Sequence, residues 1–324
     1  METRRVGRNS ILEILRLFAS LWVMYYHGYS AIVRSQMFTN GRIAVDFFFL
    51  LSGFFFLPSV FKQDKTDSVV KDAVKFVWLK FKPMMITFLI CFVFQIVGYI
   101  KFYEGFYTSP WGYLWYIPHL LCIFAVYYLL NRFIKNKMAF NLTTAAIVAV
   151  CLFLTLGRFT DFGIYRGLAG VGGGILIYQI PTLYDKNKTL KIATILMFAI
   201  SFLLIFVMSI IPPKTIIQDS VCIILLFPLV IYFSAQIPFS NKVVNKVCSI
   251  SLGLYTYQTV AGLLEDMAII TSGHILFFLV LILATVDVVV KTVVKNLRKF
   301  KKKENGWAWH SCLICCGLLL IFSF

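Results

Sequence analysis

Hydrophobic and polar positions alternate along this chain in long blocks. Apolar stretches of about 20 residues, the length at which a helix crosses a bilayer, are separated by short segments rich in lysine and arginine. Ten helical spans are predicted on this basis, at 11–33, 43–61, 83–100, 112–131, 142–157, 164–180, 192–211, 216–234, 249–270 and 275–294. Pro228 lies inside the eighth predicted span and is expected to kink it. The pattern therefore predicts an all-α, polytopic integral membrane bundle of about ten helices.

The distribution of positive charge supports the same arrangement. If the chain starts in the cytoplasm, 24 of the 31 basic residues fall in segments that the ten spans place on the inner side. Only six fall in outer segments, and Arg16 lies within a span. Such a bias follows the positive-inside rule. It predicts a multi-pass protein of the plasma membrane, with both ends of the ten-helix bundle in the cytoplasm.

Composition excludes several other classes of protein. Of the 324 residues, 60% are hydrophobic and 14% are charged, whereas a soluble domain is only about 45–50% apolar. The net charge of +17 does not indicate nucleic-acid binding, because the basic residues occupy short segments between spans and not one soluble face. The eight cysteines lie mostly in apolar runs, where a thiol packs as a small hydrophobic group. No metal site is expected.

The chain is predicted to form one membrane-embedded domain over residues 1–300, followed by a distinct end. Residues 301–324 begin with a basic segment and continue into an apolar tail that starts at Trp307. An apolar tail with tryptophans at its start could lie in the membrane interface or form an eleventh span. Both alternatives stay open from the sequence.

Two ionisable residues lie inside the first predicted span. Arg16 and His27 are 11 residues apart, which places them on nearly the same helix face and about 16 Å apart along it. Charged groups within spans usually face a cavity or a partner. Arg16 suits the binding of an anion, and His27 suits the removal of a proton from a hydroxyl near neutral pH. The alternatives are an ion pair of Arg16 with Glu13 or Asp287, and a structural role for His27 within the bundle.

The second span adds a carboxylate at a comparable depth. Asp46 lies about one turn from the outer end of this span, where it could orient the imidazole of His27. The alternative is an ion pair with Arg42, four residues earlier. In the aromatic run that follows, Ser52 and Gly53 permit close approach of a neighbouring helix.

These residues carry a resemblance to a known family. The arginine and histidine with ten residues between them resemble the signature of the membrane-bound acyltransferase-three family, and GRIAVDFFFLLSGFFF (41–56) is similar to its second-helix motif. Weaker similarities follow in family order at LKFKPMM (79–85), GYLWYIP (112–118), YRGLAGVGGG (165–174) and SISLGLYTYQ (249–258). The resemblance covers about residues 10–294.

The resemblance implies an enzyme that transfers an acyl group, acetyl in the commonest case. The donor would be acyl-coenzyme A on the cytoplasmic side, and the acceptor would be a sugar hydroxyl on a lipid-linked or surface glycan of the cell envelope. By position, the essential pair of the family falls on Arg16 and His27. Arg16 would position the coenzyme, and His27 would act as the general base with Asp46 as its orienting carboxylate.

Further residues are assigned to the two substrates. Lys80 and Lys82 are expected to meet the phosphates of the coenzyme, although their charge is also explained by the positive-inside rule. Arg42, Trp115 and Arg166 lie toward the outer side and are expected to meet the glycan. Trp115 would serve equally well as an anchor at the membrane interface.

Some features depart from the family pattern, and two rival functions stay open. Gln258 stands where the ninth-helix motif is expected to have a histidine, and lysines stand at the entry to the third helix where arginines are usual. These departures concern the substrate sites more than the class of enzyme. A transporter or flippase for a lipid-linked glycan is the main alternative, because buried ionisable groups also suit ion-coupled transport. A catalytically silent member of the family is the third possibility.

Overall fold

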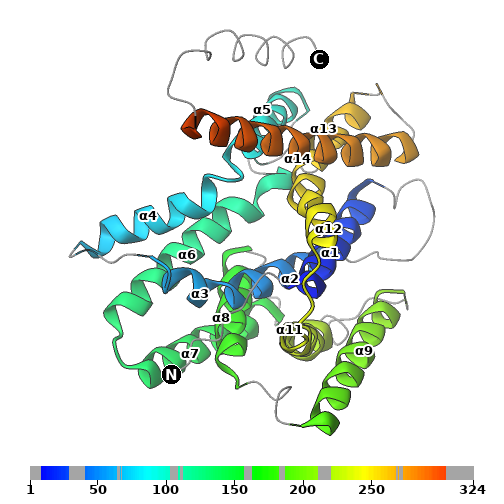
Figure 1. The fold of residues 1–324 in the computed structure, drawn as a ribbon. Helices are drawn as coiled ribbons and strands as arrows, with labels where there is room; N and C mark the ends of the chain where they lie inside the picture. Colours follow the sequence, from blue (N-terminus) through cyan, green and yellow to red (C-terminus); the bar gives the residue numbers. More distant parts are fainter. Residues whose placement is uncertain are drawn as a thin grey trace.

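The computed structural model describes residues 9–28, 41–63, 66, 68–102, 109, 112–156, 163–181, 187–210, 220–267, 269 and 273–303. These residues form a helical bundle with no strand among them, which confirms the all-α prediction (Figure 1). The elements are α1 (Ser10–Gly28), α2 (Gly41–Phe54), α3 (Phe56–Val60), α4 (Val69–Phe81), α5 (Met85–Lys101), the 3₁₀ turn η2 (Gly112–Leu114), α6 (Tyr116–Phe133), α7 (Lys137–Leu156), α8 (Gly163–Gln179), α9 (Lys188–Ile210), the π-helix η3 (Cys222–Leu226), α11 (Phe227–Gln236), α12 (Lys242–Val247), the 3₁₀ turn η4 (Cys248–Ile250), α13 (Ser251–Asp266) and α14 (Gly273–Lys303).

Each of the ten predicted spans contains a helix, but fewer helices meet the requirements of a membrane span. Within the described ranges, five are long and apolar enough: Tyr116–Phe133, Lys137–Leu156, Lys188–Met208, Lys242–Asp266 and His274–Leu297. A sixth results if α4 and α5 count together across their 77° bend. The membrane prediction is therefore supported, whereas the count of ten is not confirmed. The helix α1 carries two charges, and α2 and α8 have only 14 and 17 residues.

The bend before α5 separates a charged helix from an apolar one. Pro83 lies in this turn, where it removes a backbone donor and crowds the preceding turn of helix. Arg132, near the end of α6, lies with its Nη2 3.3 Å from Asp72 Oδ2 and donates to the carbonyl of Thr66 at 2.8 Å. The backbone N–H of Thr66 holds the pKa of Asp72 below its usual value, although burial opposes this. We therefore place the span at α5 and treat α4 as lying against one end of the bundle.

The helix ends that were predicted to share the cytoplasmic side lie together. Asn9 Nδ2, at the start of α1, donates to the carbonyl of Ser234 near the end of α11 at 2.9 Å. Tyr232 of α11 donates to the carbonyl of Pro181, just after α8, at 2.7 Å.

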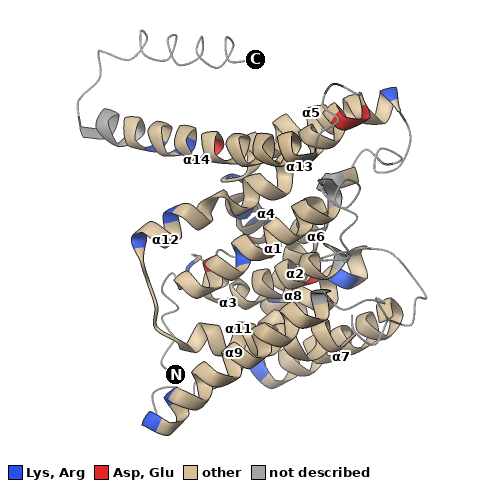
Figure 2. Ribbon diagram, turned by 90° about the vertical axis from the view of Figure 1, so that its right-hand side faces the viewer, with Lys and Arg blue, Asp and Glu red and all other residues tan. Residues whose placement is uncertain are grey.

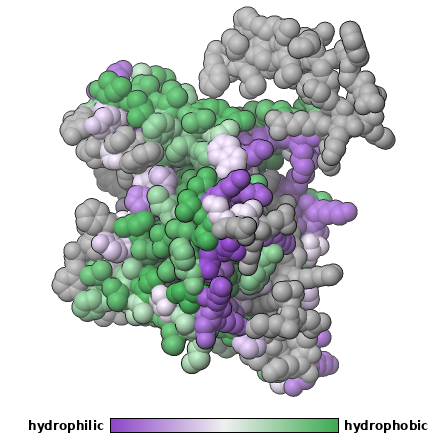
Figure 3. Space-filling view, turned by 90° about the vertical axis from the view of Figure 1, so that its left-hand side faces the viewer, coloured by the Kyte–Doolittle hydropathy of each residue, from purple (hydrophilic) through white to green (hydrophobic). Residues whose placement is uncertain are grey.

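The basic residues of the described chain concentrate at helix ends (Figure 2). On the face drawn in Figure 3, hydrophilic residues form a band that runs from top to bottom, with hydrophobic residues beside it. Residues 304–324, with the predicted apolar tail, lie outside the described part.

Two glycines allow the backbones of α2 and α8 to touch. A Cβ on Gly53 would lie 2.0 Å from the carbonyl oxygen of Val171, and one on Gly174 would lie 2.0 Å from that of Leu50. No side chain fits at either distance, because the clash is with backbone that cannot turn away. The interpretation of Gly53 as a residue that permits close helix approach is therefore confirmed.

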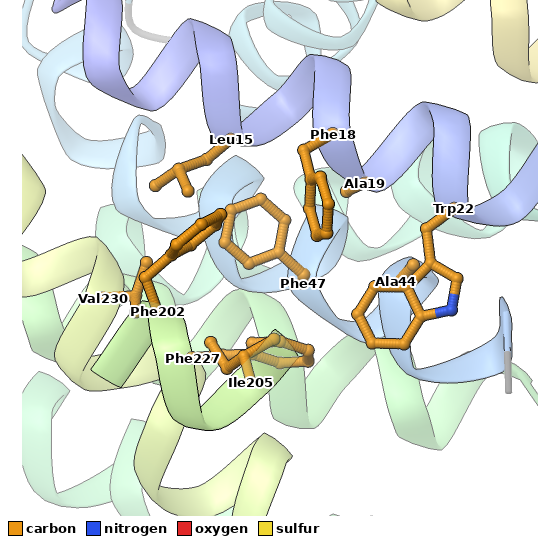
Figure 4. Close-up of a pocket in the computed structure, with 10 residues that line it drawn as sticks. All are labelled: Leu15, Phe18, Ala19, Trp22, Ala44, Phe47, Phe202, Ile205, Phe227 and Val230. Atoms are coloured by element: carbon orange, nitrogen blue, oxygen red, sulfur yellow. The ribbon is translucent and has the colours of Figure 1, made fainter. Parts of the chain in front are cut away.

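On its other side, α2 joins α1 in an apolar contact with α9 and α11 (Figure 4). Phe18 and Phe202 meet with ring centroids 5.5 Å apart, and Phe47 and Phe227 with centroids 5.4 Å apart. The remaining cavity is only about 20 Å³, far below the ~300–1,000 Å³ of a typical ligand pocket. This region is a packed core and leaves no room for a substrate.

Candidate functional site

One face of α1 points into the bundle between Leu12 and Val23. Ser20 and Val23 lie on the face that runs from Arg16 to His27, and their exposed fractions are 0% and 1%. Ile14, on the opposite face, is 44% exposed. The predicted common face of Arg16 and His27 is therefore an inward one. The side chain of His27, like that of Arg42, lies outside the described part, so the contacts predicted for them stay predictions.

Arg16 has a carboxylate partner within its own helix. Its Nη1 lies 3.0 Å from Glu13 Oε2, and the two side chains are 35% and 12% exposed. The alternative pairing with Asp287 is wrong, because Asp287 instead binds Lys291 at 2.6 Å. A pair as exposed as that of Arg16 is worth only about 0–1 kcal/mol. A guanidinium has five N–H donors, so Arg16 can still receive an anion beside Glu13.

Two hydroxyl groups, from different helices, lie close together in the bundle interior, and one of them is within electrostatic range of Arg16. The hydroxyls of Ser52 in α2 and Tyr116 in α6 are 3.2 Å apart, and the charge of Arg16 acts on the Tyr116 hydroxyl. The Tyr116 ring packs against Phe49 and Tyr255, with centroids 4.6 Å and 5.5 Å away. Sequence reasoning missed the two tyrosines as site residues, although both lie in motifs that carried the family resemblance. Here the bundle interior combines a pair of hydroxyl groups with aromatic rings.

A buried ion pair joins two residues that had been given separate roles. Arg166 donates from Nε to Asp46 Oδ1 at 3.1 Å and from Nη2 to Oδ2 at 2.8 Å, and the side chains are 8% and 7% exposed. The guanidinium carbon lies 5.8 Å from the ring centroid of Trp115, in cation–π range. The ring of His119 packs on Trp115, with centroids 5.5 Å apart. Three predicted site residues thus form one cluster, with His119 as an unpredicted neighbour.

This cluster lies near the end of the bundle that holds His27. A Cβ on Gly41, at the start of α2, would lie 2.6 Å from the side chain of Tyr26. The end of α1 therefore touches the beginning of α2. Asp46 lies five residues further along α2, or about 7.5 Å. Asp46 and its partner Arg166 therefore lie about 7.5 Å further into the bundle than the contact between Tyr26 and Gly41. The predicted contact between Asp46 and His27 stays a prediction.

The two predicted phosphate-binding lysines differ in environment. Lys80 Nζ donates to Ser59 Oγ at 2.6 Å and lies 5.9 Å from the ring centroid of Phe124. Burial, together with the nearby charge of Lys62, lowers the pKa of Lys80 to about 8. Lys82 is exposed. The structure therefore holds Lys80 against α3 and α6 and leaves Lys82 at the surface. Their role toward a coenzyme stays a prediction.

A second polar cluster, which sequence reasoning missed, connects α5 and α14. Lys291 Nζ donates to Thr87 Oγ1 at 2.5 Å and to Asp287 Oδ2 at 2.6 Å, and Thr87 donates to Asp287 Oδ1 at 2.9 Å. Every member therefore has a partner within the cluster. Among the described side chains, no group of three or more His, Cys, Asp and Glu residues could hold a metal ion.

Comparison with known proteins identifies the family. A family model described as an acyltransferase domain matches residues 9–293, from the first residue before α1 into α14. Neither curated proteins nor solved structures give a match. The matched range includes the inward face of α1 and the Asp46–Arg166 cluster. The chain therefore belongs to the acyltransferase-three family of membrane acyltransferases.

Proposed function

We propose that this protein is an O-acyltransferase that moves an acyl group, acetyl in the simplest case, from cytoplasmic acyl-coenzyme A to a sugar hydroxyl of the cell envelope or an exopolysaccharide. One observation carries the proposal: the face of α1 that bears Arg16 and His27 is buried in the bundle at Ser20 and Val23. A fixed cation and a titratable base, about 16 Å apart on one inward face, suit a long donor with an anionic end and a reactive end.

The reaction needs only a base and a path for one proton. The imidazole of His27 takes the proton from the acceptor hydroxyl, and the oxygen attacks the carbonyl carbon of the thioester. A carbon–oxygen bond forms, the carbon–sulfur bond breaks, and the departing thiolate takes the proton from the imidazolium. The products are an acyl ester and free coenzyme A, so no further reactant is required.

Arg16 supports the donor side of this proposal. Its ion pair with Glu13 is partly exposed, so an anionic donor can compete for the guanidinium at small cost. The hydroxyls of Ser52 and Tyr116, which lie 3.2 Å apart, are proposed to form hydrogen bonds to the arm of the coenzyme. Lys80 and Lys82, at the end of α4, are the proposed contacts for the phosphates of the coenzyme.

The Asp46–Arg166 cluster supports the acceptor side. The buried pair fixes Arg166 beside the indole of Trp115, and an aromatic ring next to polar groups is a suitable surface for a sugar. Asp46 is proposed to orient the imidazole of His27 as its carboxylate partner. Arg42, in the first turn of α2, is proposed as a further contact of the glycan.

The experiment compares ester-linked acyl groups on surface glycans in cells that express the wild type, His27→Ala or Ile14→Ala. Ile14 lies on the outward face of the same helix and provides the matched control. We expect equal ester content with the wild type and Ile14→Ala, and none above background with His27→Ala, at equal protein levels. Mass spectrometry of the glycans measures the esters. Wild-type ester content with His27→Ala would refute the proposed role of this residue and support a transporter or a silent family member.

A further inference from the structure

A pocket of about 220 Å³ lies beside the ion pair, between α7, α8 and η3. Its walls are mostly aliphatic, with Leu152 of α7, Leu176 of α8 and Ile223 of η3 among the lining residues. Asp46 and Arg166 also line the pocket. A mostly apolar wall with a few polar groups is typical of a ligand pocket, and here it suits an amphiphile.

The polar groups gather at one end of this pocket. Arg166 lies in the first turn of α8, and Thr155 lies in the last turn of α7. At the opposite ends of these two helices, Gln179 donates to Asn141 at 2.6 Å, so α7 and α8 run antiparallel and the first two residues share one end. The Thr155 hydroxyl is buried and has no hydrogen-bond partner within the described ranges. A buried hydroxyl without a partner destabilises the protein, and a ligand with a polar head would relieve this by forming the missing hydrogen bond.

The length of the pocket matches one leaflet of a membrane. Along α8 the lining runs from Arg166 to Ile177, which is 11 residues or about 16 Å. The hydrocarbon core of a bilayer is about 30 Å thick, so this distance is about half of it. A hydrocarbon chain that extends from a head group at Arg166 would thus run to about the middle of the membrane.

The pocket opens toward the apolar outer surface. Ile224, which lines it, and Leu225, the next residue, are each 52% exposed. Pro228 explains the shape of this wall, because its ring crowds the carbonyl four residues earlier and the preceding turns form the π-helix η3. A ligand can therefore enter sideways from the hydrocarbon layer.

We propose that this pocket binds the hydrocarbon chain of a lipid-linked acceptor, with the polar end of that lipid at Asp46, Arg166 and Thr155. The inference rests on the proposed function and deepens it, because it specifies that the acceptor arrives as a membrane-anchored amphiphile from one leaflet. The same ion pair then lies at the junction between the lipid anchor in the pocket and the reactive end of the acceptor near Trp115.

Gly173 offers a way to fill the pocket without disturbing the helix packing. A Cβ on Gly173 would lie 3.2 Å from the flexible end of Leu50, and both residues line the pocket. A Cβ on Gly170 would instead lie 2.5 Å from that of Phe49. Gly173→Leu therefore occludes the pocket, and Val150→Leu, on the outward surface of α7, is the matched control. Leu152→Trp is a second occluding variant on a different helix.

The first experiment measures binding alone. The purified protein in phosphatidylcholine nanodiscs is labelled with a long-chain prenyl phosphate that carries a photoreactive diazirine in its chain, and labelled peptides are identified by mass spectrometry. We expect labelling concentrated in α8 and η3. Labelling of Gly173→Leu should be about tenfold weaker, because the affinity falls about tenfold when about two methylene groups of the ligand are no longer buried. Uniform labelling of the outer surface, or labelling of Gly173→Leu equal to that of Val150→Leu, would overturn the inference. If Gly173→Leu fails to fold, Leu152→Trp is judged by the same criterion.

The second experiment separates this inference from the proposed function. Acyl transfer is measured with a long-chain lipid-linked sugar and with a short-chain analogue that carries the same sugar. Occlusion of the pocket is expected to raise the KM for the long-chain acceptor about tenfold and to leave kcat and the short-chain reaction unchanged. Transfer that does not depend on the pocket would contradict this inference alone. Labelling of the pocket without any transfer would contradict the proposed function alone.

Discussion

The ion pair between Asp46 and Arg166 offers a quantitative test of how α2 and α8 hold the site. Its two hydrogen bonds measure 3.1 Å and 2.8 Å, and both side chains are less than 10% exposed, at 8% and 7%. Removal of one partner leaves the other charge buried without compensation. Asp46→Asn and Arg166→Gln are therefore each expected to cost about 3–5 kcal/mol of stability.

The double variant Asp46→Asn/Arg166→Gln is expected to cost much less than the sum of the two. It leaves no buried charge, and the two amides can still form a neutral hydrogen bond, so the expected cost is about 1–2 kcal/mol. Arg166→Lys keeps the charge but lacks the planar fork that bridges both oxygens, and it should cost about 1–3 kcal/mol. Lys188→Gln, an exposed change at the start of α9, provides the control and should stay within about 0.5 kcal/mol of the wild type.

The assay is reversible unfolding in detergent micelles, followed by the fluorescence of the six tryptophans, for the wild type, both single variants and the double variant. The double-mutant cycle then yields the coupling free energy between the two side chains. A coupling of several kcal/mol is expected. Two results would refute the view that these buried charges compensate each other. One is a loss of unfolding free energy below about 1 kcal/mol in each single variant. The other is a loss in the double variant that equals the sum of the two single losses to within about 0.5 kcal/mol.

Three further predictions follow from the packing, the charges and the topology. Gly53→Ala should strongly reduce the yield of folded protein in size-exclusion chromatography, because its Cβ would lie 2.0 Å from a backbone oxygen, whereas Gly173→Ala, with 3.2 Å to a side-chain end, should be nearly neutral. Burial lowers the pKa of Lys80 from 10.5 to about 8, so the folded state binds fewer protons than the unfolded state between these values. Stability should accordingly rise from pH 8 to pH 10.5, and Lys80→Met should remove this rise in a pH series of thermal midpoints. A cysteine introduced at Lys101 should react with a membrane-impermeant maleimide added outside the cell, whereas one introduced at Lys188 should react only from the cytoplasmic side. Equal labelling of the two cysteines from outside would contradict the predicted topology.

Much of the helical fold could be predicted because its signals are local. Apolar blocks bounded by charged residues mark the helices, and each predicted span contains one. The count of spans was harder, since α2 ends at Phe54 and α8 has 17 residues, yet both are buried by neighbours. The helix α4 was missed as an element because it is amphipathic and charged, so that it resembles a connecting segment in a search for apolar runs.

In the candidate site too, contacts between residues close in sequence could be predicted, and contacts between distant residues could not. The common face of Arg16 and His27 and the pair of Arg16 with Glu13 follow from helix geometry alone, and the sequence indicated both. The contact of Asp46 with Arg166 joins positions 120 residues apart. It depends on the close packing of α2 on α8, which no local pattern specifies. The hydrogen bond between Ser52 and Tyr116, 64 residues apart, could not be predicted for the same reason.

The central claim is that Arg16 binds the donor and His27 performs the transfer along one inward face of α1. Its most direct test is a kinetic comparison of the wild type, Arg16→Gln and His27→Gln in liposomes, with acyl-coenzyme A labelled in the acyl group and a lipid-linked sugar as acceptor. We expect Arg16→Gln to raise the KM for the donor, and His27→Gln to abolish labelled ester while donor binding persists. Transfer by His27→Gln at the wild-type rate, or an unchanged donor KM for Arg16→Gln, would contradict the account.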